Sequence, residues 1–157
     1  MRTRPLGLAL LCVLLTAASA RRTDLHIVVV VNVANPLTTI PRERLSKIFL
    51  REISTWDNGQ EILPVDQIDK SLARVAFARD VQKQSVSALR RYWQERIFSG
   101  NESPPPDRVT DADVLTYVRS NPGAIGYVLE GSDLGPGVKA VVVTWAARES
   151  NTVNSHS

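Results

Sequence analysis

The sequence predicts one α/β domain of three layers, in which helices flank a mostly parallel central sheet. Residues 25–33 form a continuous run of β-branched and apolar side chains, which is typical of a strand buried on both faces. Shorter apolar runs at residues 62–65, 124–129 and 138–145 are separated by segments with helical spacing of their apolar residues. Strands that alternate with helices favour a sheet covered on both faces.

Residues 1–20 have the features of a secretory signal peptide. Two arginines precede an apolar run over residues 6–15, and the small side chains of a cleavage site stand at residues 18–20. This order is typical of an export signal, and the apolar run is too short to span a bilayer. We therefore expect cleavage after Ala20, a periplasmic protein and no membrane span in the mature chain.

The mature chain is expected to consist of an α/β domain at residues 21–148 and a disordered tail at residues 149–157. The only cysteine of the sequence, Cys12, lies in the signal peptide, so a disulfide, a thiolate nucleophile and a zinc-cysteine site are excluded in the mature chain. We expect no metal and no cofactor. The mature chain has 17 basic and 16 acidic residues, a net charge of +1. It has no basic stripe interleaved with aromatic residues, so we expect no binding to nucleic acid.

Three helices are marked by their caps. Pro41 suits the first turn of a helix that ends near Leu50, because proline lacks an N–H group that this position leaves unpaired. Ser85 is placed to cap a longer amphipathic helix. Thr110 and Asp113 form a capping-box-like start for the last one, in which each side chain bonds to the backbone of the other residue.

The segment from Ile62 to Phe77 is the centre of the functional prediction. Residues 62–65 are expected to be a buried strand and residues 66–70 a polar turn. Ser71 would cap the helix that follows, whose apolar stripe contains Leu72, Val75 and Ala76. The first N–H groups of a helix are unpaired and its dipole is positive there, so this start could bind an anion. The simpler interpretation is that Ser71 only caps the helix.

Several short motifs of this chain resemble phosphate-binding proteins of ABC importers. They are Leu45-x-x-Ile48-Phe49-Leu50, Ile53-x-x-Trp56, Ile62-x-Pro64-Val65, Ser71 with Phe77, and Pro122-Gly123-Ala124-Ile125-Gly126-Tyr127-Val128. They occur in the same order and at similar spacing, over residues 27–143. The resemblance implies one lobe of a type II periplasmic binding protein, with the mature chain beginning at what resembles the second lobe. It also implies a link to phosphate uptake or sensing.

In that family the phosphate loop is Arg, two residues, then Gly-Ser-Gly-Thr at the start of a helix. The resemblance places Ser71 at the serine and Asp69 at the acidic residue before the first glycine. The remaining positions depart from the pattern and carry Gln67 for arginine, Lys70 and Leu72 for the glycines, and Ala73 for threonine. Loss of the forked arginine and the hydroxyl should weaken anion binding, because each charge-assisted bond contributes roughly 1.5–3 kcal/mol.

These residues allow two functions and argue against a third. The first is weak binding of phosphate or a related oxyanion by Ser71, the amides of Leu72 and Ala73, and Lys70 or Gln67. The second is an interaction module that has lost its ligand and meets a protein partner or a second copy through the cleft face, which in that family closes with the other lobe around the ligand. An enzyme is not expected, because the sequence lacks paired histidines, a nucleophile elbow and a Walker loop.

Overall fold

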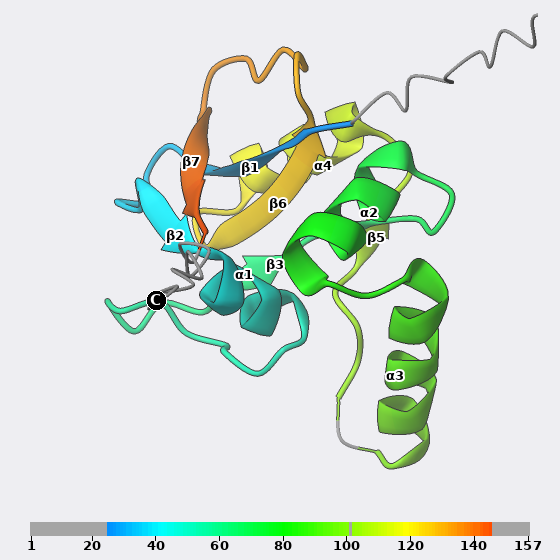
Figure 1. The fold of residues 1–157 in the computed structure, drawn as a ribbon. Coiled ribbons are helices and arrows are strands. Elements are labelled where there is room, and N and C mark those ends of the chain that lie inside the picture. The colour runs from blue at the N-terminus through cyan, green and yellow to red at the C-terminus, as the bar shows by residue number, and fades with distance from the viewer. Residues whose placement is uncertain (1–24, 101, 146–157) are drawn as a thin grey trace, which may run out of the picture.

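A five-stranded sheet forms the centre of the computed structural model, which describes residues 25–100 and 102–145 (Figure 1). Its strands are β1 (Ile27–Asn32), β2 (Thr39–Pro41), β3 (Leu63–Pro64), β6 (Ala124–Leu129) and β7 (Val138–Thr144), in the order β2-β7-β1-β6-β3. The two outer pairs, β2 with β7 and β3 with β6, are parallel. The central strand β1 is antiparallel to both β6 and β7.

The predicted α/β class is confirmed, but the sheet is mixed rather than mostly parallel. In the register, Val31 pairs with Ile125 on one side and with Lys139 on the other, so β6 and β7 both run against β1. The loop at residues 130–137 returns the chain across the sheet, held to α4 (Asp111–Ser120) by Arg119. A run of valines specifies burial on two faces but not strand direction, so the sequence pattern could not indicate this reversal.

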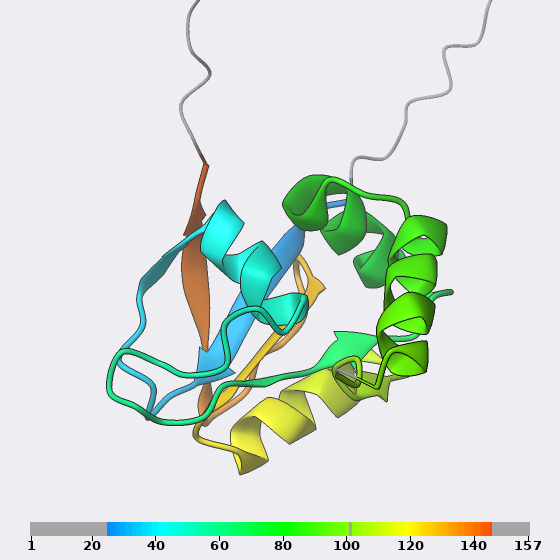
Figure 2. The same ribbon diagram turned by 90° about the horizontal axis from the view of Figure 1, so that it is seen from below.

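Helices cover both faces of the sheet, as the three-layer prediction requires (Figure 2). One face packs on α1 (Arg42–Phe49) and α2 (Leu72–Phe77), which continues into the π-helical turn η1 (Ala78–Gln82). The other face packs on α4. Along β1 the buried side chains alternate between the two cores, with Val29 and Val31 in the first and Val30 in the second, because successive side chains of a strand point to opposite faces.

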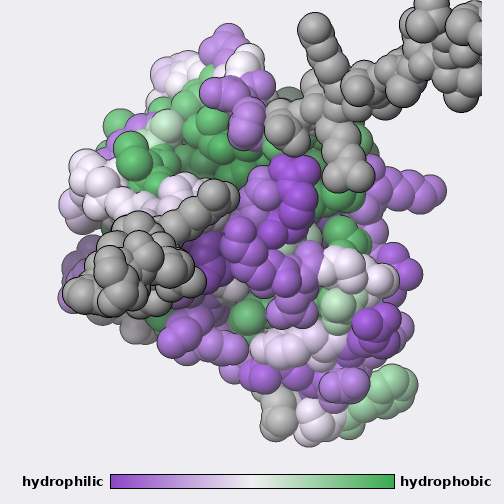
Figure 3. Space-filling model, viewed as in Figure 1, coloured by the Kyte–Doolittle hydropathy of each residue, from purple (hydrophilic) through white to green (hydrophobic). Residues whose placement is uncertain are grey.

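A second, two-stranded sheet lies beside the main sheet and borders the candidate site. Residues 66–67 are not a simple turn as expected, because they form strand β4 (Asp66–Gln67) and pair in parallel with β5 (Asp107–Arg108). Between these strands in sequence, α3 (Val86–Phe98) extends away from the sheet (Figure 1). Its buried residues are Leu89 and Trp93. On the face seen in Figure 3, apolar side chains gather over the strands in the upper part, and polar ones dominate below.

The predicted caps Ser71, Ser85 and Thr110 are confirmed, whereas Pro41 stands one residue before the first turn of α1, and the buried face of α2 is not the predicted one. The side chains of Ser71 and Ser85 accept bonds from backbone N–H groups of their helices. In α2, however, Leu72 and Val75 are 57% and 47% exposed. The residues that α2 buries are instead Ala73, Arg74, Ala76 and Phe77. The helix lies close to the sheet on its small alanine side chains, and Phe77 stacks on Tyr127 with ring centroids 4.0 Å apart.

The predicted signal peptide at residues 1–20 and the predicted tail at residues 149–157 lie outside the described residues. Across residues 25–100 and 102–145, no helix combines the length and the apolar character needed to cross a membrane.

Candidate functional site

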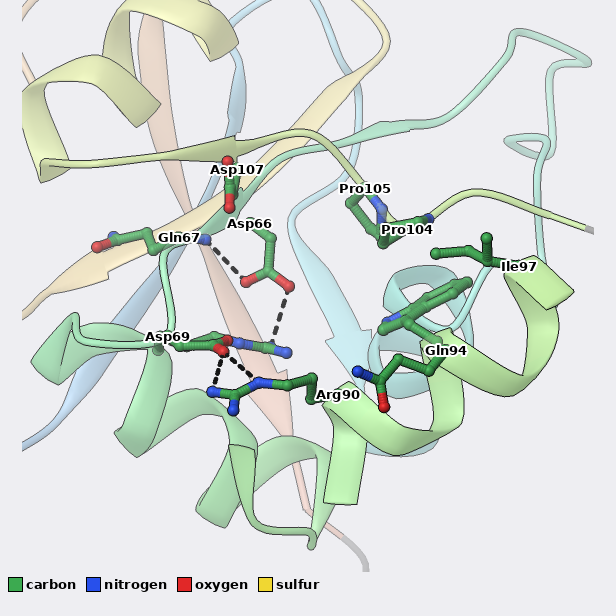
Figure 4. Close-up of a pocket in the computed structure, with 11 residues that line it drawn as sticks. Asp66, Gln67, Asp69, Arg90, Gln94, Ile97, Pro104, Pro105 and Asp107 are labelled. Atoms are coloured by element: carbon green, nitrogen blue, oxygen red, sulfur yellow. Dashed lines mark hydrogen bonds and ion pairs between the residues drawn. The ribbon is translucent and has the colours of Figure 1, made fainter. Parts of the chain in front are cut away.

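A pocket of about 220 Å³ lies where β4, β5, α2 and α3 meet (Figure 4). Its lining combines charged and amide side chains with the apolar side chains of Trp93, Ile97, Pro104 and Pro105. Two of the predicted site residues, Gln67 and Asp69, are part of this lining. The pocket therefore lies next to the helix start that the sequence singled out.

A buried ion pair forms the floor of the pocket. Nη1 of Arg74 lies 3.0 Å from Oδ2 of Asp66, and the two residues are only 4% and 7% exposed. The other oxygen of Asp66 accepts bonds from the Tyr127 hydroxyl and from the backbone N–H of Gln67. Arg74 also donates to Oε1 of Gln82 at 3.0 Å. Every group in this network therefore has a partner from within the chain.

The side chain of Gln67, which the resemblance places at the arginine of the phosphate loop, bonds to three groups within the chain. Its Nε2 donates to Asp111 at 2.8 Å and to the carbonyl of Tyr127 at 3.0 Å, and its Oε1 accepts a bond from the Ser71 hydroxyl. The Ser71 oxygen in turn accepts from the N–H of Arg74, which caps α2. Ser71 and Gln67 are thus joined to each other rather than directed at an open site.

The other predicted residues do not converge on one point. Asp69 pairs with Arg90 of α3 at 2.5 Å, and both side chains are largely exposed. Lys70 is exposed on the turn before α2, and Leu72 is exposed on the helix. Ala73 is buried against the core. Of the six predicted residues, the structure brings Gln67 and Ser71 into direct contact and separates the others.

Burial dominates the electrostatics of the ion pair. Desolvation raises the pKa of the Asp66 carboxyl above its usual 3.8, and the nearby charge of Arg74 opposes that shift, as do the bonds from Tyr127 and Gln67. Burial, together with the charge of Asp66, raises the pKa of the Tyr127 hydroxyl well above its usual value. Tyr127 is therefore a neutral hydrogen-bond donor at any physiological pH.

Sequence reasoning missed the two residues that anchor this site, Arg74 and Tyr127. Arg74 lies in α2, and the apolar stripe predicted for this helix is not the face that the structure buries. Tyr127 lies in the apolar run at residues 124–129, where the sequence alone does not distinguish it from an ordinary strand residue. A signal did exist, because Arg74 lies on the same helical side as the apolar residues Ala73 and Phe77. Among the described residues, no group of three or more His, Cys, Asp or Glu side chains is placed to hold a metal ion.

Comparisons with known proteins agree with this architecture. A family model described as a PBP superfamily domain matches residues 25–154. An ABC-type phosphate transport receptor from Vibrio cholerae superposes with a TM-score of 0.59 at 23% identity, over 76% of this chain and 50% of the receptor. PstS from Borrelia burgdorferi gives a TM-score of 0.59 at 16% identity, over 76% and 47% of the two chains. The chain thus spans about half the length of these structures, and no curated protein sequence matches it.

Proposed function

This chain belongs to the PBP superfamily domain family, and on that premise we propose that it is an exported lobe related to solute-binding proteins that acts by contacting another protein. The proposal is supported by the finding that the strongest hydrogen-bond donors of the site bond to other groups of the same chain. The Ser71 hydroxyl bonds to Gln67, and the Arg74 guanidinium pairs with Asp66. The Ser71 hydroxyl and Nη1 of Arg74 would each have to give up a bond inside the chain to reach a dissolved phosphate.

The balance of energies at this site also disfavours an oxyanion. Separating a buried ion pair leaves a charge without a partner and costs about 3–5 kcal/mol, whereas each new charge-assisted bond to a ligand contributes roughly 1.5–3 kcal/mol. Carboxylates surround the site and would repel an anion; they belong to Asp66, Asp69, Asp107 and Asp111. The two nearby guanidinium groups are already paired with Asp66 and Asp69.

The outer face of α2 is the surface through which we propose contact. Leu72 and Val75 stand one helical turn apart and are exposed, and Val75 lines a shallow apolar hollow with Val86 at the start of α3. Lys83 lies at the edge of this hollow. The chemistry of this face therefore suits a protein segment that presents apolar side chains beside a carboxylate.

Site-specific photo-crosslinking in the native host tests this contact. A photoreactive amino acid at position 72 should give one discrete crosslinked protein, and the same group at the exposed Val142 of β7 should give none. The crosslink at position 72 should weaken when Val75 is replaced by Asp, because a charge would then enter the apolar contact. Equal crosslinking from both positions, or none from either, would contradict the proposal.

Weak oxyanion binding is the second candidate function. It is favoured by the exposed Lys70 beside the first turn of α2, where the N–H groups of Leu72 and Ala73 have no partner within the helix. The name of the Vibrio cholerae structure, a phosphate transport receptor, points in the same direction. Titration with phosphate followed by amide NMR would then shift the signals of Leu72 and Ala73, and a Lys70→Met variant would reduce those shifts.

A further inference from the structure

We propose that the carboxylate of Asp66 occupies a built oxyanion site, so that this lobe carries its own anion in place of a dissolved one. The inference rests on the proposed function, because it gives the reason why the lobe would need no ligand. It also goes further, since it assigns a site and the class of ion that the site accepts: a small carboxylate.

Three donors from three different elements converge on this one carboxylate. Oδ1 of Asp66 accepts the N–H of Gln67 from β4 at 2.8 Å and the hydroxyl of Tyr127 from β6. Oδ2 lies 3.0 Å from the guanidinium of Arg74 in α2. A backbone amide, a neutral hydroxyl and a guanidinium directed at two oxygens are the groups that proteins use to hold oxyanions. Figure 4 shows the Asp66 carboxylate with its contact to the backbone of Gln67.

The donors are held in place by contacts that do not involve Asp66. Arg74 is anchored by Oε1 of Gln82. The ring of Tyr127 stacks on Phe77 with an angle of 8° between the ring planes, and it also contacts Phe49. Removal of the carboxylate would therefore leave a donor set that is already arranged around an empty position, and such preorganised donors offset part of the cost of burying an anion there.

The pocket gives an ion a route to that position. Asp66 and Arg74 both line the 220 Å³ pocket, so the space left by a shorter side chain at position 66 would join it. The vacated volume is that of one carboxylate group, which formate matches and phosphate exceeds. A lobe that holds its own carboxylate keeps the same surface whatever the external concentration of oxyanions, as a protein-contact function requires.

Chemical rescue of an Asp66→Ala variant tests the inference. We expect this variant to melt well below the wild type, and sodium formate at about 100 mM to raise its melting temperature by several degrees through binding to the folded state. Sodium chloride at the same concentration should not. The matched controls are the wild type and Asp69→Ala, whose carboxylate sits on the exposed partner Arg90; formate should act on them no more than chloride does.

A double variant identifies the donor that binds the ion. Combining Asp66→Ala with Arg74→Met should abolish the rescue, because the guanidinium is gone. If Asp66→Ala does not fold alone, recovery of its folded signal in formate becomes the readout, with Asp66→Asn as the folded reference. Formate that acts equally on Asp66→Ala and wild type, or rescue that survives Arg74→Met, would overturn the inference. Failed crosslinking at position 72 would instead overturn the proposed contact and leave the formate result intact.

Discussion

Arg74 is the residue on which the polar centre of this lobe depends. Its guanidinium is buried, pairs with Asp66 and bonds to Gln82, so it links β4 to α2 and η1. The chain offers a second pair with the same chemistry, Arg90 with Asp69, at an exposed position. The two pairs therefore allow the effect of burial to be measured within one protein.

Replacement of Arg74 by methionine should lower the free energy of unfolding by about 3–5 kcal/mol, because Asp66 would remain buried without a countercharge. Replacement of Arg90 by methionine should cost less than about 1 kcal/mol, because water screens the exposed pair. Urea unfolding of both variants against the wild type measures the difference. Similar losses for the two variants would mean that the Asp66–Arg74 pair is not shielded from water as described.

The raised pKa of Asp66 predicts how its contribution depends on pH. A carboxyl whose pKa is higher in the folded state than in the unfolded state binds its proton more tightly when the protein is folded. Its contribution to stability is therefore complete below the pKa of the unfolded state and is lost as the pH rises through the pKa of the folded state. With an ordinary value of 3.8, the stability of the wild type relative to Asp66→Asn should fall as pH rises above about 4. Urea unfolding at several pH values measures this difference. A difference that grows with pH would show that Arg74 and Tyr127 outweigh burial.

At the scale of elements, the helix boundaries follow from local side-chain chemistry. In α4, Thr110 accepts the N–H of Asp113 while Asp113 accepts the N–H of Thr110, which completes the predicted capping box. Such local signals are readable because the residues that form them lie three positions apart. The orientation of α2 is different, since it depends on the ring of Tyr127 in β6, which stacks on Phe77 and lies about fifty residues further along the chain.

The capping box makes a measurable contribution to α4. Thr110→Ala should lower the free energy of unfolding by about 1 kcal/mol, because it leaves a helix N–H unpaired. Thr116→Ala in the same helix is the matched control, since its hydroxyl only bonds back to the carbonyl of Ala112 on the exposed surface, and it should be close to neutral. Thermal or urea unfolding compares the two. Equal effects would show that the cap does not determine the stability of this helix.

At the scale of the whole molecule, the sequence predicted the three-layer α/β lobe, its four helices and the helix start that borders the pocket. It did not predict the antiparallel central strand, because the valines of β1 are equally compatible with either direction. The sequence placed Gln67 and Ser71 in one candidate site, but it did not predict the hydrogen bond between them or the role of Arg74. The internal pairing of these groups depends on residues from five separate elements, β4, α2, η1, α4 and β6, and no short stretch of sequence encodes it.

Thermal unfolding of the domain in the presence of oxyanions tests the central claim most directly, namely that the polar groups at the start of α2 are satisfied from within. The series would contain phosphate, sulfate, arsenate and molybdate at matched ionic strength, with Ser71→Ala as the paired variant. We predict no anion-specific change in the melting temperature. A ligand at a hundred times its dissociation constant would add about 2.7 kcal/mol, or a few degrees. Such a shift with one oxyanion, removed by Ser71→Ala, would contradict the account and establish an open binding site.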